Sequence, residues 1–254
     1  MTNNLINFIS DSLDLEYEVN VVTDGDSETL VLYDGVECVD YETIDNHTFL
    51  KDSYLGGFCG ITSIVIPKTV TNINCNALNK CKWLESIVVS DDNETYSSQD
   101  GVLYDKNKTK LYYVPPKVKL TELVLPDTVT EIAEKAFDCC KNLKSVVIPS
   151  SVKRIGGMAF SHCLSLESVV IPDSINVIDY GTFISCRNLK SINIPNSVTR
   201  INDSAFHSTG LESVVIPDSV IEIEARAFRY SKLTNVSVPK NTIVGEDAFE
   251  CFPY

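Results

Sequence analysis

The sequence predicts a right-handed α/β repeat solenoid, with a parallel β-sheet on one side of each coil and short helical turns or loops on the other. Pro126, Pro149, Pro172 and Pro195 lie 23 residues apart, and the interval then shortens to 22 residues. Each of these prolines follows a leucine and two further aliphatic residues in the spacing L-x-x-L-x-L, as in 143–148. A period in the twenties with this spacing is typical of leucine-rich-repeat solenoids.

Each repeat is expected to form one coil. The aliphatic residues of 143–148 point inward from a short strand, and Pro149 ends that strand because it cannot donate a backbone hydrogen bond. Phe160 is expected to be buried in a tight turn or short helix. One coil offers about six large apolar side chains worth roughly 1.5–3 kcal/mol each. Ordering a residue costs about 1.5 kcal/mol, so a coil is stable only when stacked on its neighbours.

Residues 1–35 do not follow the repeat and are expected to form an N-terminal cap. Residues 5–15 have weak helical character, whereas 17–22 and 29–33 alternate as strands do, with a turn at 24–26 between them. This pattern predicts a helix and a β-hairpin that cover the first coil, whose core would otherwise be exposed.

Residues 36–254 are expected to form the solenoid, with a degenerate coil at 36–60, where Ile44 and Phe49 keep the spacing of the later coils, and a C-terminal cap near 249–254. The regular coils begin their strands at Ile61, Leu84, Leu120, Leu143, Leu166, Leu189, Leu211 and Leu233.

The segment 90–119 interrupts the repeat. It begins with the acidic loop 91–94, and the apolar runs 101–104 and 110–116 flank a polar turn at 105–109. We expect a β-hairpin inserted between two coils. Its tyrosines form either an aromatic contact patch or a cover for the hairpin against the coils.

The net charge of −14, from 35 acidic and 21 basic residues, argues against binding to nucleic acid or to an anionic membrane. No segment is apolar for long enough to insert into a membrane. Residues 1–10 lack the features of a signal peptide, so the chain as given is expected to be cytoplasmic, exported by another route, or already trimmed of an export signal.

Four of the nine cysteines share one repeat position: Cys81, Cys140, Cys163 and Cys186. Equivalent residues of adjacent coils lie about 4.8 Å apart with parallel side chains, which suits a disulfide poorly. We expect a column of buried thiols rather than a metal site, because no C-x-x-C pair is present. No cofactor or catalytic residue is predicted, since the chain has no phosphate-binding loop, G-x-S-x-G or H-E-x-x-H motif. Its three histidines fall at unrelated positions.

Residues 36–250 contain the repeated motif LxSVxIPxSVxxIxxxAFxxC and the insertion NETYSSQDGVLYDKNKTKLYYVPP. In these two features they resemble the BspA-like family of leucine-rich-repeat proteins. The resemblance implies a bacterial or protist surface protein that binds host proteins or mediates adhesion, and it carries no catalytic residues. It favours a cell-surface or secreted location over a cytoplasmic one.

The outward positions of the strands are the predicted binding surface. One outward column alternates in charge at Lys144, Glu167 and Lys190, and another is mostly valine. The valines reflect either β-propensity or an apolar binding stripe. The candidate contacts with a partner are Lys144, Val147, Glu167, Val170, Lys190, Asn193, Tyr112 and Tyr113.

The sequence thus predicts a non-enzymatic module that binds a protein of unknown identity, with adhesion or host-protein interaction as its role. The alternative is an intracellular or virion-like structural scaffold that uses the same surface for assembly. The oligomeric state does not follow from the residues.

Overall fold

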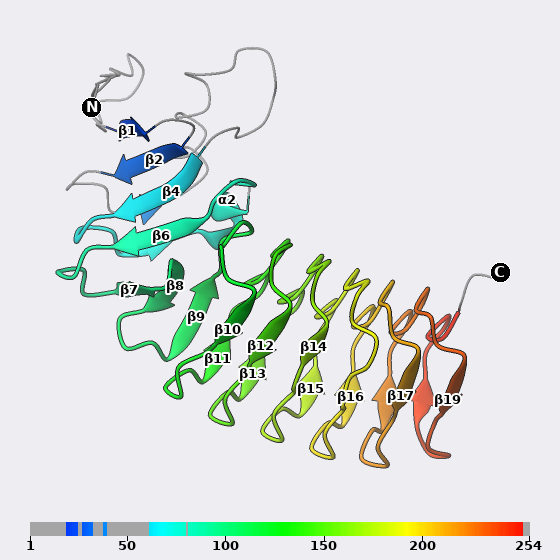
Figure 1. Cartoon of the computed structure of the whole chain (residues 1–254). Helices are drawn as coiled ribbons and strands as arrows, with labels where there is room; N and C mark the ends of the chain where they lie inside the picture. The colour runs from blue at the N-terminus through cyan, green and yellow to red at the C-terminus, as the bar shows by residue number, and fades with distance from the viewer. Residues whose placement is uncertain (1–18, 25–26, 33–37, 40–60, 80, 251–254) are drawn as a thin grey trace, which may run out of the picture. The chain divides into compact units, whose positions relative to one another are not determined.

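A computed structural model of the chain describes residues 19–24, 27–32, 38–39, 61–79 and 81–250 (Figure 1). The chain divides into two compact units. The first comprises Met1–Asn107 with Pro115–Val118, and the second comprises Lys108–Val114 with Lys119–Tyr254. Both units are built from parallel strands that repeat from coil to coil, as expected for a solenoid.

The first unit contains a four-stranded sheet in the order β1-β2-β4-β6. β1 (Val19–Asp24) and β2 (Ser27–Leu32) pair antiparallel, close to where the sequence predicted two strands. β2 then pairs parallel with β4 (Ile61–Ile66), and β4 with β6 (Ser86–Val89). β4 and β6 are the strands of two successive coils.

The same unit holds two smaller elements. β3 (Cys38–Val39) pairs parallel with β5 (Asn72–Ile73), and α2 (Cys75–Leu78) is the only helix among the described residues. The helix expected at 5–15, the residues Ile44 and Phe49 of the degenerate coil, and the last four residues of the C-terminal cap lie outside the described residues.

The part of the insertion that belongs to the first unit contains an antiparallel hairpin of β7 (Tyr96–Gln99) and β8 (Val102–Asp105). Asp100 and Gly101 connect the strands, with φ angles of 54° and 79°. Two consecutive positive φ angles are typical of a type I′ turn, for which Asp-Gly is a preferred pair. β7 was not predicted from the sequence, because its polar residues carry no apolar alternation.

Asn93 anchors the loop that precedes this hairpin. Its side chain is fully buried, and its Nδ2 donates to the carbonyls of Pro67 and Val70 at 2.8 and 3.0 Å. Its Oδ1 accepts from the backbone N–H groups of Thr95 and Tyr96 at 2.9 and 2.7 Å. The loop therefore holds a buried polar residue that satisfies backbone groups of the coil before it.

The second unit contains the predicted parallel ladder, called here the first ladder. β10 (Glu122–Val124), β12 (Ser145–Val147) and β14 (Ser168–Val169) pair in parallel, with equivalent residues of successive coils opposite one another. β17 (Ser213–Val215) and β19 (Asn235–Ser237) continue the pattern in the last coils. Figure 1 shows these coils following one another from green to red.

Away from the first ladder, where short helical turns or loops were predicted, the second unit forms a second parallel ladder of short strands. β9 (Lys110–Tyr113), β11 (Glu131–Ile132) and β13 (Arg154–Ile155) pair in parallel. So do β15 (Val177–Ile178), β16 (Arg200–Ile201), β18 (Glu222–Ile223) and β20 (Ile243–Val244). No described residue of the second unit is helical, so the loops of the prediction are observed rather than the helical turns, and the described chain is a β-solenoid with almost no helix.

The turns that carry the phenylalanines are also hydrogen-bonded between coils. The N–H of Phe137 donates to the carbonyl of Ala159 at 2.7 Å, and the N–H of Phe160 donates to that of Thr182 at 2.8 Å. A helix would have used these groups within its own coil. Each turn contains residues with φ near +55° to +62°, among them Lys135, Cys139, Met158, His162, Gly181, Ser185, Ser204 and Ser208.

The core of the second unit is organised around a column of stacked phenylalanine rings. Neighbouring ring centroids lie 4.5–5.4 Å apart with interplanar angles of 6–18°. The column consists of Phe137, Phe160, Phe183, Phe206, Phe228 and Phe249. The first five rings have no exposed surface, which confirms the predicted burial of Phe160.

The cysteine column is buried, as predicted, and its four cysteines form no disulfide bond. The Sγ of Cys163 donates to the carbonyl of Phe137 at 3.0 Å, and that of Cys186 donates to the carbonyl of Phe160 at 3.0 Å. Burial is the main reason that the pKa values of Cys140 and Cys186 are raised well above the usual range. These thiols therefore stay protonated. They pack in the core and donate hydrogen bonds to backbone carbonyl oxygens.

Gly210 lies in the shortened connection between Phe206 and Leu211, where two coil backbones approach closely. A Cβ at this position would lie 2.2 Å from the carbonyl oxygen of Arg187. The Gly210 N–H donates to the carbonyl of Cys186 at 3.1 Å. The close approach of two coil backbones is possible here only without a side chain.

Candidate interaction surface

The outward side chains of the first ladder form a continuous surface, called here the strand face. Alternation along β12 buries Val146 and exposes 54% of Val147. Val124, Val170 and Val215 are exposed by 67%, 68% and 80% at equivalent positions. An exposed valine therefore recurs along this ladder, interrupted by the exposed Asn193.

Charged side chains run beside this valine row. Lys144 Nζ lies 3.5 Å from Glu167 Oε1, and both side chains are more than half exposed. Such an exposed pair contributes less than about 1 kcal/mol to stability, so it remains available to a partner. Lys190 is exposed in the next coil, and its carbonyl accepts from the N–H of Glu212 at 3.1 Å.

The two tyrosines predicted to flank the strand face lie elsewhere. Both are on β9, which pairs with β11 in the second ladder rather than with the strands of the first. Tyr113 shares the inward face of β9 with Leu111 and is only 1% exposed, so it offers a partner no surface. Tyr112 points outward and is half-buried, with Lys110 Nζ 5.2 Å from its ring centroid. The prediction of Tyr113 as a contact residue was therefore wrong.

The outward side chains of the second ladder differ from those of the strand face because several are charged and paired. Glu131 Oε1 lies 3.0 Å from Lys110 Nζ and 3.1 Å from Arg154 Nη1. Arg200 Nη2 lies 2.6 Å from Glu222 Oε2. These ion pairs join adjacent coils. The charges on this surface are therefore already compensated within the chain, whereas the valine row offers apolar surface to a partner.

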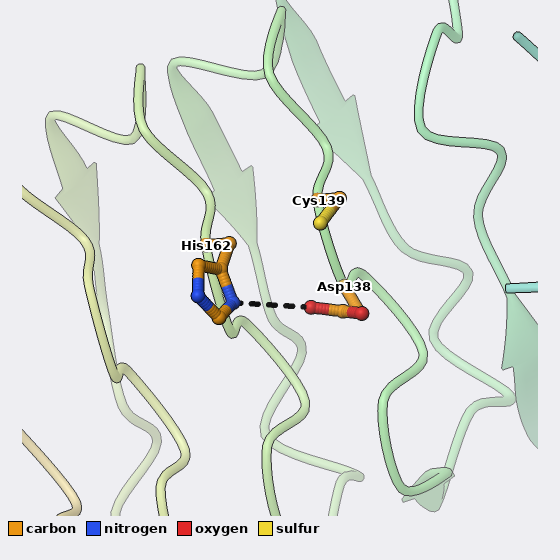
Figure 2. Close-up of side chains that lie close together, drawn as sticks. All are labelled: Asp138, Cys139 and His162. Carbon is orange, nitrogen blue, oxygen red and sulfur yellow. Dashed lines mark ion pairs between the residues drawn. The ribbon is translucent and has the colours of Figure 1, made fainter. Parts of the chain in front are cut away.

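A separate polar cluster lies in the turns of two adjacent coils, where Asp138, Cys139 and His162 point toward one another (Figure 2). Their potential ligand atoms lie within 4.8 Å of one another. Burial, followed by the charge of Asp138, raises the pKa of the Cys139 thiol to about 11. The sequence analysis missed this cluster, although Cys139 and His162 each stand two residues after a phenylalanine of the core column.

No helix in the described part of the chain is long and apolar enough to cross a membrane.

The repeats match a known family. The family described as BspA type leucine rich repeat region matches residues 48–114 and 112–234, in six copies. The chain belongs to this family. None of the curated proteins compared with it matches. The BspA-type match covers the coils that contain the valine row, the cysteine column and most of the phenylalanine column.

Solved structures of leucine-rich-repeat proteins have similar folds. A leucine-rich cell surface protein from Faecalibacterium prausnitzii is 32% identical over 85% of this chain and 52% of its own length, with a TM-score of 0.66. A leucine-rich repeat protein from Eubacterium ventriosum is 28% identical over 75% of this chain and 58% of its own, with a TM-score of 0.63. The pneumococcal vaccine antigen PcpA is 23% identical and shares the fold, with a TM-score of 0.51 over 73% of this chain and 50% of its own. The BspA-type chain thus spans little more than half the length of these proteins.

Proposed function

We propose that this BspA-type chain is a non-enzymatic protein-binding module, and that its strand face contacts the partner. The exposed valine row carries the proposal. Exposed aliphatic residues that gather on one surface, rather than lying scattered singly, are typical of interaction sites. The rigid parallel ladder holds them at fixed spacing, so little side-chain order has to be gained on binding.

The proposed contact residues are Lys144, Val147, Glu167, Val170, Lys190 and Asn193. A stable interface needs roughly 800 Å² on each partner, which requires several adjacent coils rather than one loop. Lys144 and Glu167 border the apolar row and supply the polar rim that such interfaces have. Tyr112 lies on the second ladder and is not part of this proposal.

We propose adhesion or host-protein binding as the biological role. The support is the similarity to the Faecalibacterium prausnitzii protein, which is described as a leucine-rich cell surface protein. The net charge of −14 favours partners that present basic surface. Protease treatment of intact source cells tests the location, because a surface protein is degraded while a cytoplasmic scaffold is protected.

The binding proposal is tested by replacing Val147 and Val170 together with lysine. Both side chains are more than half exposed, so the variant should fold, and the added charges should abolish binding to purified matrix or plasma proteins that bind the native chain. The matched control is Ile221→Lys, an aliphatic residue that is 61% exposed and precedes β18 of the second ladder. Normal binding by the folded double variant would exclude the strand face.

Two further proposals concern how the chain is divided and the handedness of its coils. We propose that residues 1–35 cap a solenoid formed by 36–254, with the insertion at 90–119 and a C-terminal cap near 249–254. The pairing of β2 with β4 supports the N-terminal cap, because it places the hairpin of β1 and β2 on the edge of a coil strand. We also propose right-handed coiling, since crossover connections between parallel strands are right-handed in almost all proteins.

A further inference from the structure

We propose that Asp138, Cys139 and His162 form a binding site for a single transition-metal ion of the Zn²⁺ type. The three residues supply a carboxylate oxygen, a sulfur and an imidazole nitrogen. These are the donor types that Zn²⁺ takes in proteins, and a thiolate with an imidazole disfavours Mg²⁺ and Ca²⁺.

The distances are close to those a bound ion requires. Bonds of about 2.0–2.3 Å to a tetrahedral Zn²⁺ place the ligand atoms roughly 3.3–3.7 Å from one another. Asp138 Oδ1 and His162 Nδ1 lie 3.6 Å apart, and the three ligand atoms lie within 4.8 Å of one another. The thiol therefore needs to move by no more than about 1.5 Å, a shift that side-chain rotation provides.

The backbone of the solenoid holds the ligands in place. Cys139 and His162 occupy the same position in adjacent coils, and both have left-handed φ angles, of 62° and 55°. The Cys139 N–H donates to the carbonyl of Ser161 at 2.9 Å, which fixes the two turns against each other. Because the two residues share a conformation and a register, their side chains leave the backbone in the same direction. A site built this way is preorganised on a rigid ladder.

A cation would also compensate for the burial of a carboxylate oxygen that accepts no hydrogen bond within the described part of the chain. Asp138 Oδ1 is buried and accepts no hydrogen bond from the described residues. Leaving a buried acceptor without a partner is unfavourable. His162 is more exposed, so the ion can enter from its side.

The fourth ligand is water, because the Ser161 hydroxyl lies too close to His162 Nδ1 for both to ligate one tetrahedral ion and has to turn away from Nδ1 when the ion binds. The Oγ of Ser161 lies 2.6 Å from His162 Nδ1, and the Ser161 side chain is fully buried. On binding, the Cys139 thiol loses its proton to solvent, and the ion takes its place on the sulfur.

The test is a titration of the full chain with Co²⁺ and Zn²⁺ under reducing conditions. Co²⁺ bound to a thiolate gives a charge-transfer absorption band, so the spectrum reports directly on the sulfur ligand. We expect one equivalent of Co²⁺ to produce this band and one equivalent of Zn²⁺ to remove it by displacement.

Cys139→Ser should abolish the band, and His162→Ser should weaken binding at least about tenfold. Serine is a compatible replacement at His162, because Ser185 and Ser208 have the same conformation in the following coils. The control is Cys75→Ser, which removes a half-buried thiol outside the cluster that is not in a disulfide, and which should leave the spectrum unchanged. No band in the native chain, or an equal band in Cys139→Ser, would overturn the assignment.

Discussion

Replacing Phe183 with alanine tests whether the stacked phenylalanine rings stabilise the coils, because this ring lies in the interior of the phenylalanine column. Its neighbours Phe160 and Phe206 stack on its two sides at 5.3 and 5.4 Å between centroids. The ring has no exposed surface. Alanine removes both stacking contacts and leaves a cavity between two coils.

The expected loss of stability follows from these contacts. Burying a phenylalanine side chain contributes about 1.5–3 kcal/mol, and each stacked aromatic pair adds about 0.5–1.5 kcal/mol. With two pairs these contributions amount to about 2.5–6 kcal/mol, which brackets the range of about 3–5 kcal/mol for Phe→Ala substitutions in protein cores.

The measurement is urea denaturation followed by far-UV circular dichroism, with the free energy of unfolding extrapolated to water. Val215→Ala is the control, because this side chain is 80% exposed and its loss should cost less than about 0.5 kcal/mol. A loss of less than about 1 kcal/mol for Phe183→Ala would mean that the column does not carry the stability of the coils.

Three further outcomes are expected from the structure. Asn93→Ala should destabilise the chain by about 2–4 kcal/mol in the same denaturation assay, because it leaves several buried backbone groups without partners; a neutral effect would show that these groups are satisfied otherwise. Gly210→Ala should cost about 1–3 kcal/mol, because its Cβ would overlap the carbonyl of Arg187, and an unchanged urea midpoint would contradict the close approach. Burial and the nearby Arg229 and Arg226 lower the pKa of His207. The contribution of His207 to the stability of the fold should therefore be complete above about pH 6.5 and should fall as the pH decreases through that value. His207→Gln should flatten this part of the pH profile of the melting temperature.

The repeat made most of the core predictable. The columns of Phe160 and Cys163 recur at fixed positions, so burial in one coil implies burial in the next. The register of the first ladder followed in the same way, because Val124 and Val147 occupy equivalent positions and pair directly.

The second ladder could not be predicted from periodicity, because strands such as Arg154–Ile155 contain only two residues and show no alternation. The sequence left open whether Phe160 lies in a tight turn or a short helix, because an A-F pair favours neither structure by itself, and the structure shows a turn. The hairpin of β7 and β8 was missed although Asp100-Gly101 is a strong turn signal, because the polar residues 96–99 do not resemble a strand.

The candidate site was predictable only where it follows the repeat. Val147 and Val170 lie on the strand face because alternation along the strand requires it. Tyr113 was assigned to the surface by its chemistry, but alternation with Leu111 turns it inward. The cluster around His162 forms because residues of two adjacent coils lie side by side. A search for motifs within one segment does not reveal such neighbours.

The most direct test of the proposed strand-face interaction is methyl NMR of the chain during titration with a purified matrix or plasma protein that binds it. We predict that the methyl signals of Val124, Val147, Val170 and Val215 shift or broaden on binding. The methyl signals of Ile221 and Ile243, exposed on the second ladder, should remain unchanged. Shifts confined to Ile221 and Ile243, with the four valines unaffected, would contradict the strand face as the binding surface.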